Sequence, residues 1–213
     1  MPIAAQKDAY AIILDAISNG EYTPGTPLVE SDLAEKLGMS RTPIREALQR
    51  LETQSILHRE GRSLIVSSLD HDQMGELYTV RGEMEGLAAR LAAQHAADEE
   101  IAVLKNMVKA DWDLVDDPQA LARANKRFHW QVHLASHNRY LIQQIEYVHR
   151  AMALLVKTTL AEEGRGEQAQ REHEAIVEAI AARDGEAACS AIRLHISRAY
   201  ETRLQFDLEA EHA

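Results

Sequence analysis

Apolar side chains recur every three or four residues along most of the chain, which is the spacing of amphipathic helices. The spacing is clearest in the stretch 40–51, SRTPIREALQRL, where one face carries Ile44, Ala47, Leu48 and Leu51. Pro43 is compatible with a helix start because first-turn amides have no intrahelical acceptor. The pattern predicts a helix whose opposite, solvent-facing side carries Arg41, Thr42, Arg45 and Gln49.

Two shorter helices are expected before this one. The first covers residues 7–19, and the second begins with Ser31 as its N-cap and ends at Gly38. Two short helices joined by a glycine-containing turn are typical of helix-turn-helix proteins. The spacing therefore predicts that the stretch beginning at Ser40 is the second helix of such a pair.

A β-hairpin is expected directly after these helices. Short apolar runs at 56–59 and 64–67 flank a turn that contains Gly61. Such a hairpin would place Arg59 and Arg62 where they could touch the backbone or minor groove of DNA. Three helices and a hairpin predict a winged helix-turn-helix domain over residues 1–69.

The remainder of the chain predicts only helices. The breaks fall at polar, glycine-containing or proline-containing positions and give expected helices over 71–95, 98–115, 118–136, 138–163, 166–182 and 184–208. Short breaks are typical of antiparallel neighbours. The predicted fold is mainly α, with the winged helix-turn-helix domain followed by an all-α antiparallel six-helix bundle over residues 70–213.

The distribution of charge narrows the class of partner. The formal net charge is −11, so the whole molecule is not a general binder of polyanions. Between residues 40 and 62, however, five arginines stand against three glutamates. Such local positive charge suits sequence-specific DNA contact better than bulk electrostatic binding.

Arg41 and Arg45 lie one turn apart near a helix start, beside the hydroxyl group of Thr42. A helix start of this kind can meet phosphates and guanine edges together. The alternative is an ordinary surface helix with solvated arginines. The pattern of this helix alone leaves both alternatives open.

The single cysteine, Cys189, allows no intrachain disulfide, which agrees with a reducing compartment. The N-terminus lacks the basic-then-apolar pattern of a signal peptide, and no apolar run approaches membrane-spanning length. We therefore expect a soluble cytoplasmic protein that has no membrane partner.

The run PGTPLVESDLAEKLGMSRTPIREALQRLETQSIL, followed by GR, resembles the DNA-binding domain of GntR-type bacterial transcription regulators over residues 8–67. The resemblance implies a homodimer that binds a palindromic operator in double-stranded DNA. It also implies that Arg41, Thr42 and Arg45 contact the operator and that Gly61 lets the wing, with Arg62, approach DNA. Two departures are Ser55, where the family often has glycine, and Glu60, an acidic group at the wing tip.

Three histidines of the second domain lie in suggestive places among the ten in the chain. His129 follows Asn125 by one turn in one predicted helix, whereas His173 and His195 lie in the last two. Facing helices of a bundle can bring such imidazoles onto one metal ion. Hydrogen-bonded surface or core histidines are the alternative, and the spacing alone does not decide.

The motif FH, then EH, then a histidine in the last helix resembles the FadR C-terminal (FCD) ligand-binding domain of the same regulators, over residues 71–208. The resemblance implies a divalent metal ion (zinc, nickel or manganese) held by Asn125, His129, His173 and His195. Asn125 replaces the usual aspartate, so the ligand set loses a negative charge. His133 matches no ligand position and is expected beside the ligands or on the surface. Six helices indicate the VanR-like subgroup.

The same resemblance implies a pocket above the metal for a small carboxylate effector. Arg81, in the first helix of the bundle, is the candidate to bind the effector, because a guanidinium pairs bidentately with a carboxylate. The alternative is an intrahelical pair with Glu85, four residues later.

Three functions compete at this point: a ligand-responsive dimeric transcription regulator, a metal-dependent helical enzyme, and a helical scaffold. A di-iron enzyme needs Glu-x-x-His pairs on two helices, and within the predicted helices only Glu146 and His149 have that spacing. A scaffold leaves the histidines unexplained. We expect a regulator, acting as a repressor, and not an enzyme. The sequence does not identify the effector, the regulated genes, the metal or the direction of the ligand response.

Overall fold

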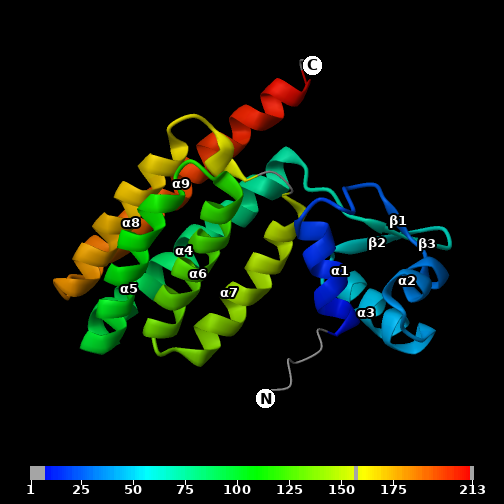
Figure 1. Ribbon diagram of the computed structural model, residues 1–213, viewed down its shortest axis with the longest axis horizontal. Helices are drawn as coiled ribbons and strands as arrows, with labels where there is room; N and C mark the ends of the chain where they lie inside the picture. Colours follow the sequence, from blue (N-terminus) through cyan, green and yellow to red (C-terminus); the bar gives the residue numbers. More distant parts are fainter. Residues whose placement is uncertain (1–7, 156–157, 212–213) are drawn as a thin grey trace. The chain divides into compact units, whose positions relative to one another are not determined.

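The structure is a computed structural model that describes residues 8–155 and 158–211 (Figure 1). The chain divides into two compact units. One contains the described residues through Gln73, together with the segment that begins at Tyr147 and ends before Thr158. The other contains Met74–Glu146 and the described residues from Thr158 onward.

The first unit has the architecture of a winged helix-turn-helix domain. Its elements through residue 70 are α1 (Ala9–Ser18), β1 (Pro27–Leu28), α2 (Glu30–Leu37), α3 (Arg41–Thr53), β2 (Leu57–Glu60) and β3 (Ser63–Val66). The apolar face predicted for α3 is buried, and Ile44 and Leu51 are fully enclosed. The structure thus confirms the predicted N-terminal fold.

Of the two predicted ends of α2, the structure confirms the C-terminal end and not the N-terminal one. Gly38 ends α2 with φ +63°, a left-handed conformation that glycine adopts without strain. The predicted N-cap at Ser31 is wrong, because Val29 precedes the first helical residue and Ser31 lies inside the first turn. The Ser31 hydroxyl donates to Asp32 Oδ1 at 2.9 Å and does not cap the helix.

The predicted hairpin is confirmed and is part of a three-stranded antiparallel sheet in the order β1-β3-β2. Leu57 pairs with Val66 and Glu60 with Ser63, so Gly61 lies in the tight turn with φ +60°. The sequence did not predict β1. That strand has only two residues and begins with proline, which lacks an amide hydrogen and suits a sheet edge.

Ser55, in the turn after α3, has φ +59°. A residue with a Cβ is strained by about 1–2 kcal/mol in this left-handed region. The strain gives a physical reason why glycine is often found at this position in the family that the sequence resembles.

The core of the first unit joins helices, sheet and a distant segment. Ile13 and Ile17 of α1, Leu48 of α3 and Val66 of β3 belong to one buried cluster. Leu154 joins the same cluster from the 3-10 helix η2 (Met152–Leu154). Full burial of such a side chain contributes about 1.5–3 kcal/mol, so this segment of the later chain stabilises the first unit.

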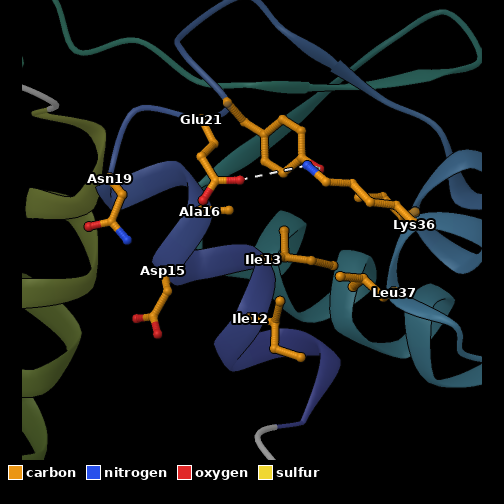
Figure 2. Close-up of a pocket in the computed structure, with 10 residues that line it drawn as sticks. Ile12, Ile13, Asp15, Ala16, Asn19, Glu21, Lys36 and Leu37 are labelled. Carbon is orange, nitrogen blue, oxygen red and sulfur yellow. Dashed lines mark hydrogen bonds and ion pairs between the residues drawn. The ribbon is translucent and has the colours of Figure 1, made fainter.

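A pocket of about 200 Å³ lies between α1 and α2 within the first unit (Figure 2). Ile13 and Leu37 supply apolar lining, while the polar rim holds Lys36, which lies 3.6 Å from Glu21 and donates to the Tyr22 hydroxyl at 2.9 Å. The pocket is a gap in the packing of the two helices that is closed on one side by this exposed ion pair.

From residue 71 onward the described chain forms six α-helices, as predicted. They are α4 (His71–His95), α5 (Asp98–Asp111), α6 (Pro118–Ala135), α7 (Arg139–Ala151), α8 (Arg165–Ala181) and α9 (Gly185–Glu211). None of the helices in the described part of the chain is long and apolar enough to cross a membrane.

Two helix ends differ from the prediction. The helix expected over 98–115 ends at Asp111 and continues as the 3-10 helix η1 (Trp112–Leu114). The helix expected over 138–163 ends at Ala151 and is followed by η2 and by η3 (Thr159–Ala161). Thr158 caps η3 by accepting a hydrogen bond from the Leu160 amide at 3.3 Å. The β-branched threonines of this stretch disfavour a continuous α-helix.

Small residues let the helices of the second unit approach closely. Four alanines of α4 are fully buried: Ala88, Ala89, Ala92 and Ala93. A Cβ added at Gly86 would lie 3.1 Å from the Sγ atom of Cys189 on α9. Figure 1 shows α8 and α9 side by side, in agreement with their extensive packing. Polar side chains between these helices are therefore far from solvent.

Candidate metal centre and candidate DNA interface

The start of α3 presents the side chains predicted to contact DNA. Arg41, Thr42 and Arg45 are all exposed. Arg45 is held by Glu30 of α2, because its Nε donates to Oε2 at 2.9 Å and its Nη2 donates to Oε1 at 2.8 Å. A bidentate pair of this kind fixes the plane of the guanidinium. Its Nη1 group takes no part in the pair and can reach another acceptor.

The wing presents a second exposed group. Gly61 and Arg62 are exposed at the β2–β3 turn. Arg59 is instead held against α3, where Glu52 accepts from its Nε at 2.9 Å and from its Nη2 at 2.8 Å. Arg62 is therefore the arginine of this hairpin that lies at its tip.

Three of the predicted metal ligands meet in the second unit. His129 of α6, His173 of α8 and His195 of α9 are almost fully buried, and one nitrogen from each lies within 4.8 Å of the others. The Phe128 ring stacks on His173 with the ring centroids 4.1 Å apart. The helices thus hold three imidazoles in a closely spaced cluster.

The carboxylates around the cluster orient two of its rings. Nδ1 of His129 lies 2.5 Å from Glu85 Oε2, and Nδ1 of His195 lies 2.7 Å from Glu172 Oε2. Each carboxylate favours the proton on Nδ1 and leaves the lone pair of Nε2 inward. The two Nε2 atoms are 3.2 Å apart. Two ligands bound about 2.1 Å from one ion at right angles lie about 3 Å apart, so this spacing fits a shared cation.

Further donor atoms of the predicted ligands have no hydrogen-bond partner among the described residues. Both ring nitrogens of His173 and Oδ1 of Asn125 are buried without a hydrogen bond among the described residues. A buried polar atom left without a partner costs about 1–3 kcal/mol. Two imidazole rings with inward lone pairs and a third without hydrogen bonds form a donor set that fits a divalent metal ion. Asn125, one turn before His129 on α6, offers an unbonded amide oxygen.

The electrostatics favour neutral imidazoles at His129, His173 and His195 and a charged carboxylate at Glu85. Burial, assisted by the neighbouring imidazole of His195, lowers the pKa of His173 well below its ordinary value. Burial would raise the pKa of Glu85, but Arg81 and His129 outweigh it and hold that pKa well below the usual range. Neutral imidazoles are the form that binds metal ions.

Comparison with known proteins identifies the family of the chain. Residues 76–198 match the FCD domain family, and residues 5–65 match the family described as bacterial regulatory proteins, gntR family. The chain is also 31% identical to the HTH-type transcriptional regulator YdhC of Bacillus subtilis (strain 168). The alignment spans 186 residues, which are 85% of this chain and 83% of YdhC. The chain belongs to the GntR family.

Other relatives of this GntR protein are also regulators of transcription. It is 30% identical to a probable D-xylose utilization operon transcriptional repressor of Paenarthrobacter nicotinovorans, over 87% of this chain and 82% of the relative. It is 27% identical to the galactonate operon transcriptional repressor of Escherichia coli (strain K12), over 81% of this chain and 85% of that repressor. These matches confirm the prediction of a DNA-binding transcription regulator and not an enzyme.

The fold of the GntR regulator also matches a solved structure. E. coli McbR/YncC superposes with a TM-score of 0.81 at 22% identity, covering 92% of this chain and 95% of that one. At this identity the likeness concerns the fold alone. It agrees with the mainly helical architecture and the small N-terminal sheet.

Two residues singled out from the sequence take buried positions in the regulator. Arg81 forms the intrahelical pair, with its Nε donating to Glu85 Oε1 at 2.7 Å. His133 is fully buried, with its Nε2 3.3 Å from Glu85 Oε2, so it lies beside the predicted ligands and not on the surface. Glu85 therefore joins Arg81, His129 and His133.

Sequence reasoning missed Glu85 and Glu172 as parts of the centre. Glu85 was considered only as a partner for Arg81, although it faces His129 across the bundle. Glu172 directly precedes His173 in the chain, yet it bonds His195 on the next helix. The available signal for Glu172 was an acidic residue beside a predicted ligand on the same helix, which is typical of carboxylate–histidine pairs around metals. Glu85 lies on α4, which carries none of the predicted metal ligands, so no such signal pointed to it.

Proposed function

We propose that this GntR regulator is a homodimeric repressor whose affinity for a palindromic operator is set by a small carboxylate bound beside a divalent metal ion in the FCD domain. The convergence of three buried imidazoles within 4.8 Å carries the proposal. The relatives named as repressors of the D-xylose and galactonate operons support repression as the response.

Asn125, His129, His173 and His195 would hold the metal ion. Imidazole nitrogens and an amide oxygen admit zinc, nickel or manganese. The bound ion would supply positive charge that attracts a carboxylate. Glu85 and Glu172 would orient two of the imidazoles by accepting their Nδ1 protons.

Arg81 is the residue that we assign to the effector carboxylate. Its Nε donates to Glu85, but the terminal Nη1 and Nη2 take no part in that hydrogen bond. Two parallel N–H groups match a carboxylate better than an ammonium does. Arg81→Lys keeps the charge opposite Glu85 and should weaken effector binding without unfolding the domain.

The recognition side chains would act as a pair in the dimer. Two-fold symmetry places two α3 helices in successive major grooves, with Arg41, Thr42 and Arg45 at base edges and phosphates. Gly61 and Arg62 would bring the wing to the backbone. Only residues 67–70 separate β3 from α4, the helix that carries Arg81 and Glu85. Effector binding on α4 is therefore close in sequence to the DNA-binding unit.

Metal analysis and operator binding test the proposal. Purified protein should carry about one divalent ion per chain, and His173→Ala should lose it whereas His133→Ala, the matched control, should retain it. Retention of the ion by His173→Ala would remove His173 from the site. Asn125→Asp should tighten metal binding because a carboxylate adds negative charge to the ligands. Equal affinity for palindromic and random duplex would contradict the operator assignment.

A further inference from the structure

The two carboxylates that orient imidazoles of the candidate metal centre are each paired with a buried arginine. Glu85 Oε1 accepts from Nε of Arg81 at 2.7 Å, and the side chains of this pair are 0% and 10% exposed. Glu172 Oε2 lies 3.0 Å from Nη2 of Arg165, in the first turn of α8, with side chains 6% and 3% exposed. Two arginines and two glutamates give these buried ion pairs a net charge of zero.

Each ion pair continues to a predicted metal ligand. Glu85 Oε2 lies 2.5 Å from Nδ1 of His129, and Glu172 Oε2 lies 2.7 Å from Nδ1 of His195. A carboxylate that accepts from Nδ1 raises the basicity of a metal-binding imidazole. A guanidinium that pairs with the same carboxylate compensates its negative charge. The arginines therefore limit how much negative charge the glutamates contribute to the metal ligands.

The electrostatic effect of Arg165 reaches the histidine cluster. The pKa of His195 lies well below its ordinary value, first because of burial and then because of the neighbouring His129, Arg165 and Arg81. A positive charge that opposes protonation of an imidazole also opposes the approach of a metal ion to that imidazole. Arg165 thus belongs to the electrostatic surroundings of the centre.

The predicted ligands themselves also carry no charge. His129, His173 and His195 offer neutral imidazoles, and Asn125 offers an amide oxygen where the family usually has aspartate. Imidazole nitrogen suits zinc and nickel, whereas manganese prefers carboxylate oxygen. Three nitrogens and one uncharged oxygen therefore form a set of ligands that is poor for manganese.

On the basis of the proposed function, we propose that Asn125 and the two buried arginines make the centre selective for zinc or nickel and exclude manganese. A hard ion depends more on negatively charged oxygen ligands, and this ligand set supplies none. Zinc and nickel bind imidazole nitrogen more strongly and depend less on such charge. Asn125 is then the specificity-determining ligand, whereas Arg81 and Arg165 are positioning residues that act through Glu85 and Glu172.

Competition with a chromophoric chelator tests the selectivity. Metal-free protein is titrated with zinc, nickel and manganese ions at one pH and one ionic strength. The order of stability of nitrogen-ligand sites predicts that zinc and nickel bind roughly 100-fold or more tightly than manganese. Manganese affinity equal to zinc affinity would overturn this inference and leave the proposed metal centre intact. Failure of all three ions to bind would overturn both.

Asn125→Asp tests the specificity-determining ligand. The added carboxylate should favour manganese more than zinc, so the ratio of zinc to manganese affinity should fall about tenfold. Asn138→Asp is the matched control, because it adds the same charge directly before α7, where residue 138 accepts from the Leu141 amide at 3.1 Å. That control should keep the ratio of the parent protein. An unchanged ratio in Asn125→Asp, or an equal fall in Asn138→Asp, would contradict the role of Asn125.

Arg165→Gln tests the positioning residues. Removal of the guanidinium leaves the charge of Glu172 less compensated, so all three ions should bind roughly tenfold more tightly, an effect that structural damage would not produce. Arg198→Gln is the control, because Arg198 also donates to Glu172 but its side chain is 38% exposed and its charge is screened by water. Arg165→Lys keeps the charge and should bind metal as the parent does.

Unchanged or weaker metal binding in folded Arg165→Gln would overturn the role of the arginine. Circular dichroism of each variant establishes whether it folds. If Arg165→Gln does not fold, the ratio of zinc to manganese affinity in Asn125→Asp still decides the selectivity.

Discussion

The two candidate sites of this regulator use arginine–glutamate pairs in opposite settings. On the DNA-binding unit, Arg45 pairs with Glu30 at the surface, with side chains 61% and 27% exposed. In the bundle, Arg81 pairs with Glu85 at 10% and 0% exposure. Exposed pairs contribute little to stability and can exchange partners, whereas loss of one partner from a buried pair is strongly unfavourable. The exposed Arg45 is thus available to DNA, whereas the buried Arg81 and Glu85 stabilise the candidate metal centre.

The largest effect is expected for Glu85→Ala. Removal of this carboxylate leaves Arg81 buried without its partner and His129 without the acceptor for Nδ1. The free energy of unfolding, measured with urea in the presence of a chelator, should fall by about 3–5 kcal/mol. Glu83→Ala is the matched control on the same helix, because Glu83 forms an exposed pair with Arg193. In that control the free energy of unfolding should fall by less than about 1 kcal/mol. Equal decreases in the two variants would contradict the contrast between buried and exposed pairs.

Arg45→Ala should affect DNA recognition and not stability. If Arg45 reads a guanine, operator affinity should fall roughly 5- to 150-fold and preference at one base pair should relax. Fluorescence anisotropy with operator and single-site variants measures both effects. Arg50→Ala is the control at the other end of α3, where Arg50 stacks on Tyr10 with 3.8 Å to the ring centroid. Unchanged discrimination in Arg45→Ala would remove it from base recognition.

Arg62→Ala should produce a smaller and less specific loss. Contact with phosphate alone predicts similar weakening for operator and random duplex, and a salt slope reduced by about one. Arg59→Ala should change the slope less, because Glu52 already holds that side chain. A larger effect on the operator than on random duplex would mean that the wing reads sequence.

Ser55→Gly should give the smallest change, an increase in stability. Relief of the left-handed conformation at φ +59° should raise the free energy of unfolding by about 0.5–1 kcal/mol. Thr53→Gly, two residues earlier in helical conformation, should instead lower it. Thermal denaturation of the two variants in parallel distinguishes local strain from a general effect of glycine.

Local signals in the sequence predicted most elements of the fold. The apolar spacing of α3, Gly38 at the end of α2 and the Gly61 turn each depend on neighbouring residues, and all three are confirmed. The strand β1 and the packing of Leu154 in the first unit depend on partners far along the chain. No local pattern specifies such pairings, which is why the sequence did not reveal them.

The same distinction applies to the candidate centre. Helical spacing and the family resemblance pointed to His129, His173 and His195, and the structure brings them together. The role of Glu172 was not predicted, because it depends on which helix faces α8. A buried charge is meaningful only through its partners, and partners across a bundle are set by tertiary packing.

The central claim is that the buried centre controls the exposed DNA-binding face. The most direct measurement is operator affinity with and without the tightest-binding carboxylate, in metal-loaded and chelator-treated protein. Coupling between two sites predicts a five- to 150-fold change in the metal-loaded protein, whereas the chelator-treated protein should bind the operator without responding to the acid. An equal response after metal removal, or no response in the metal-loaded protein, would contradict the account.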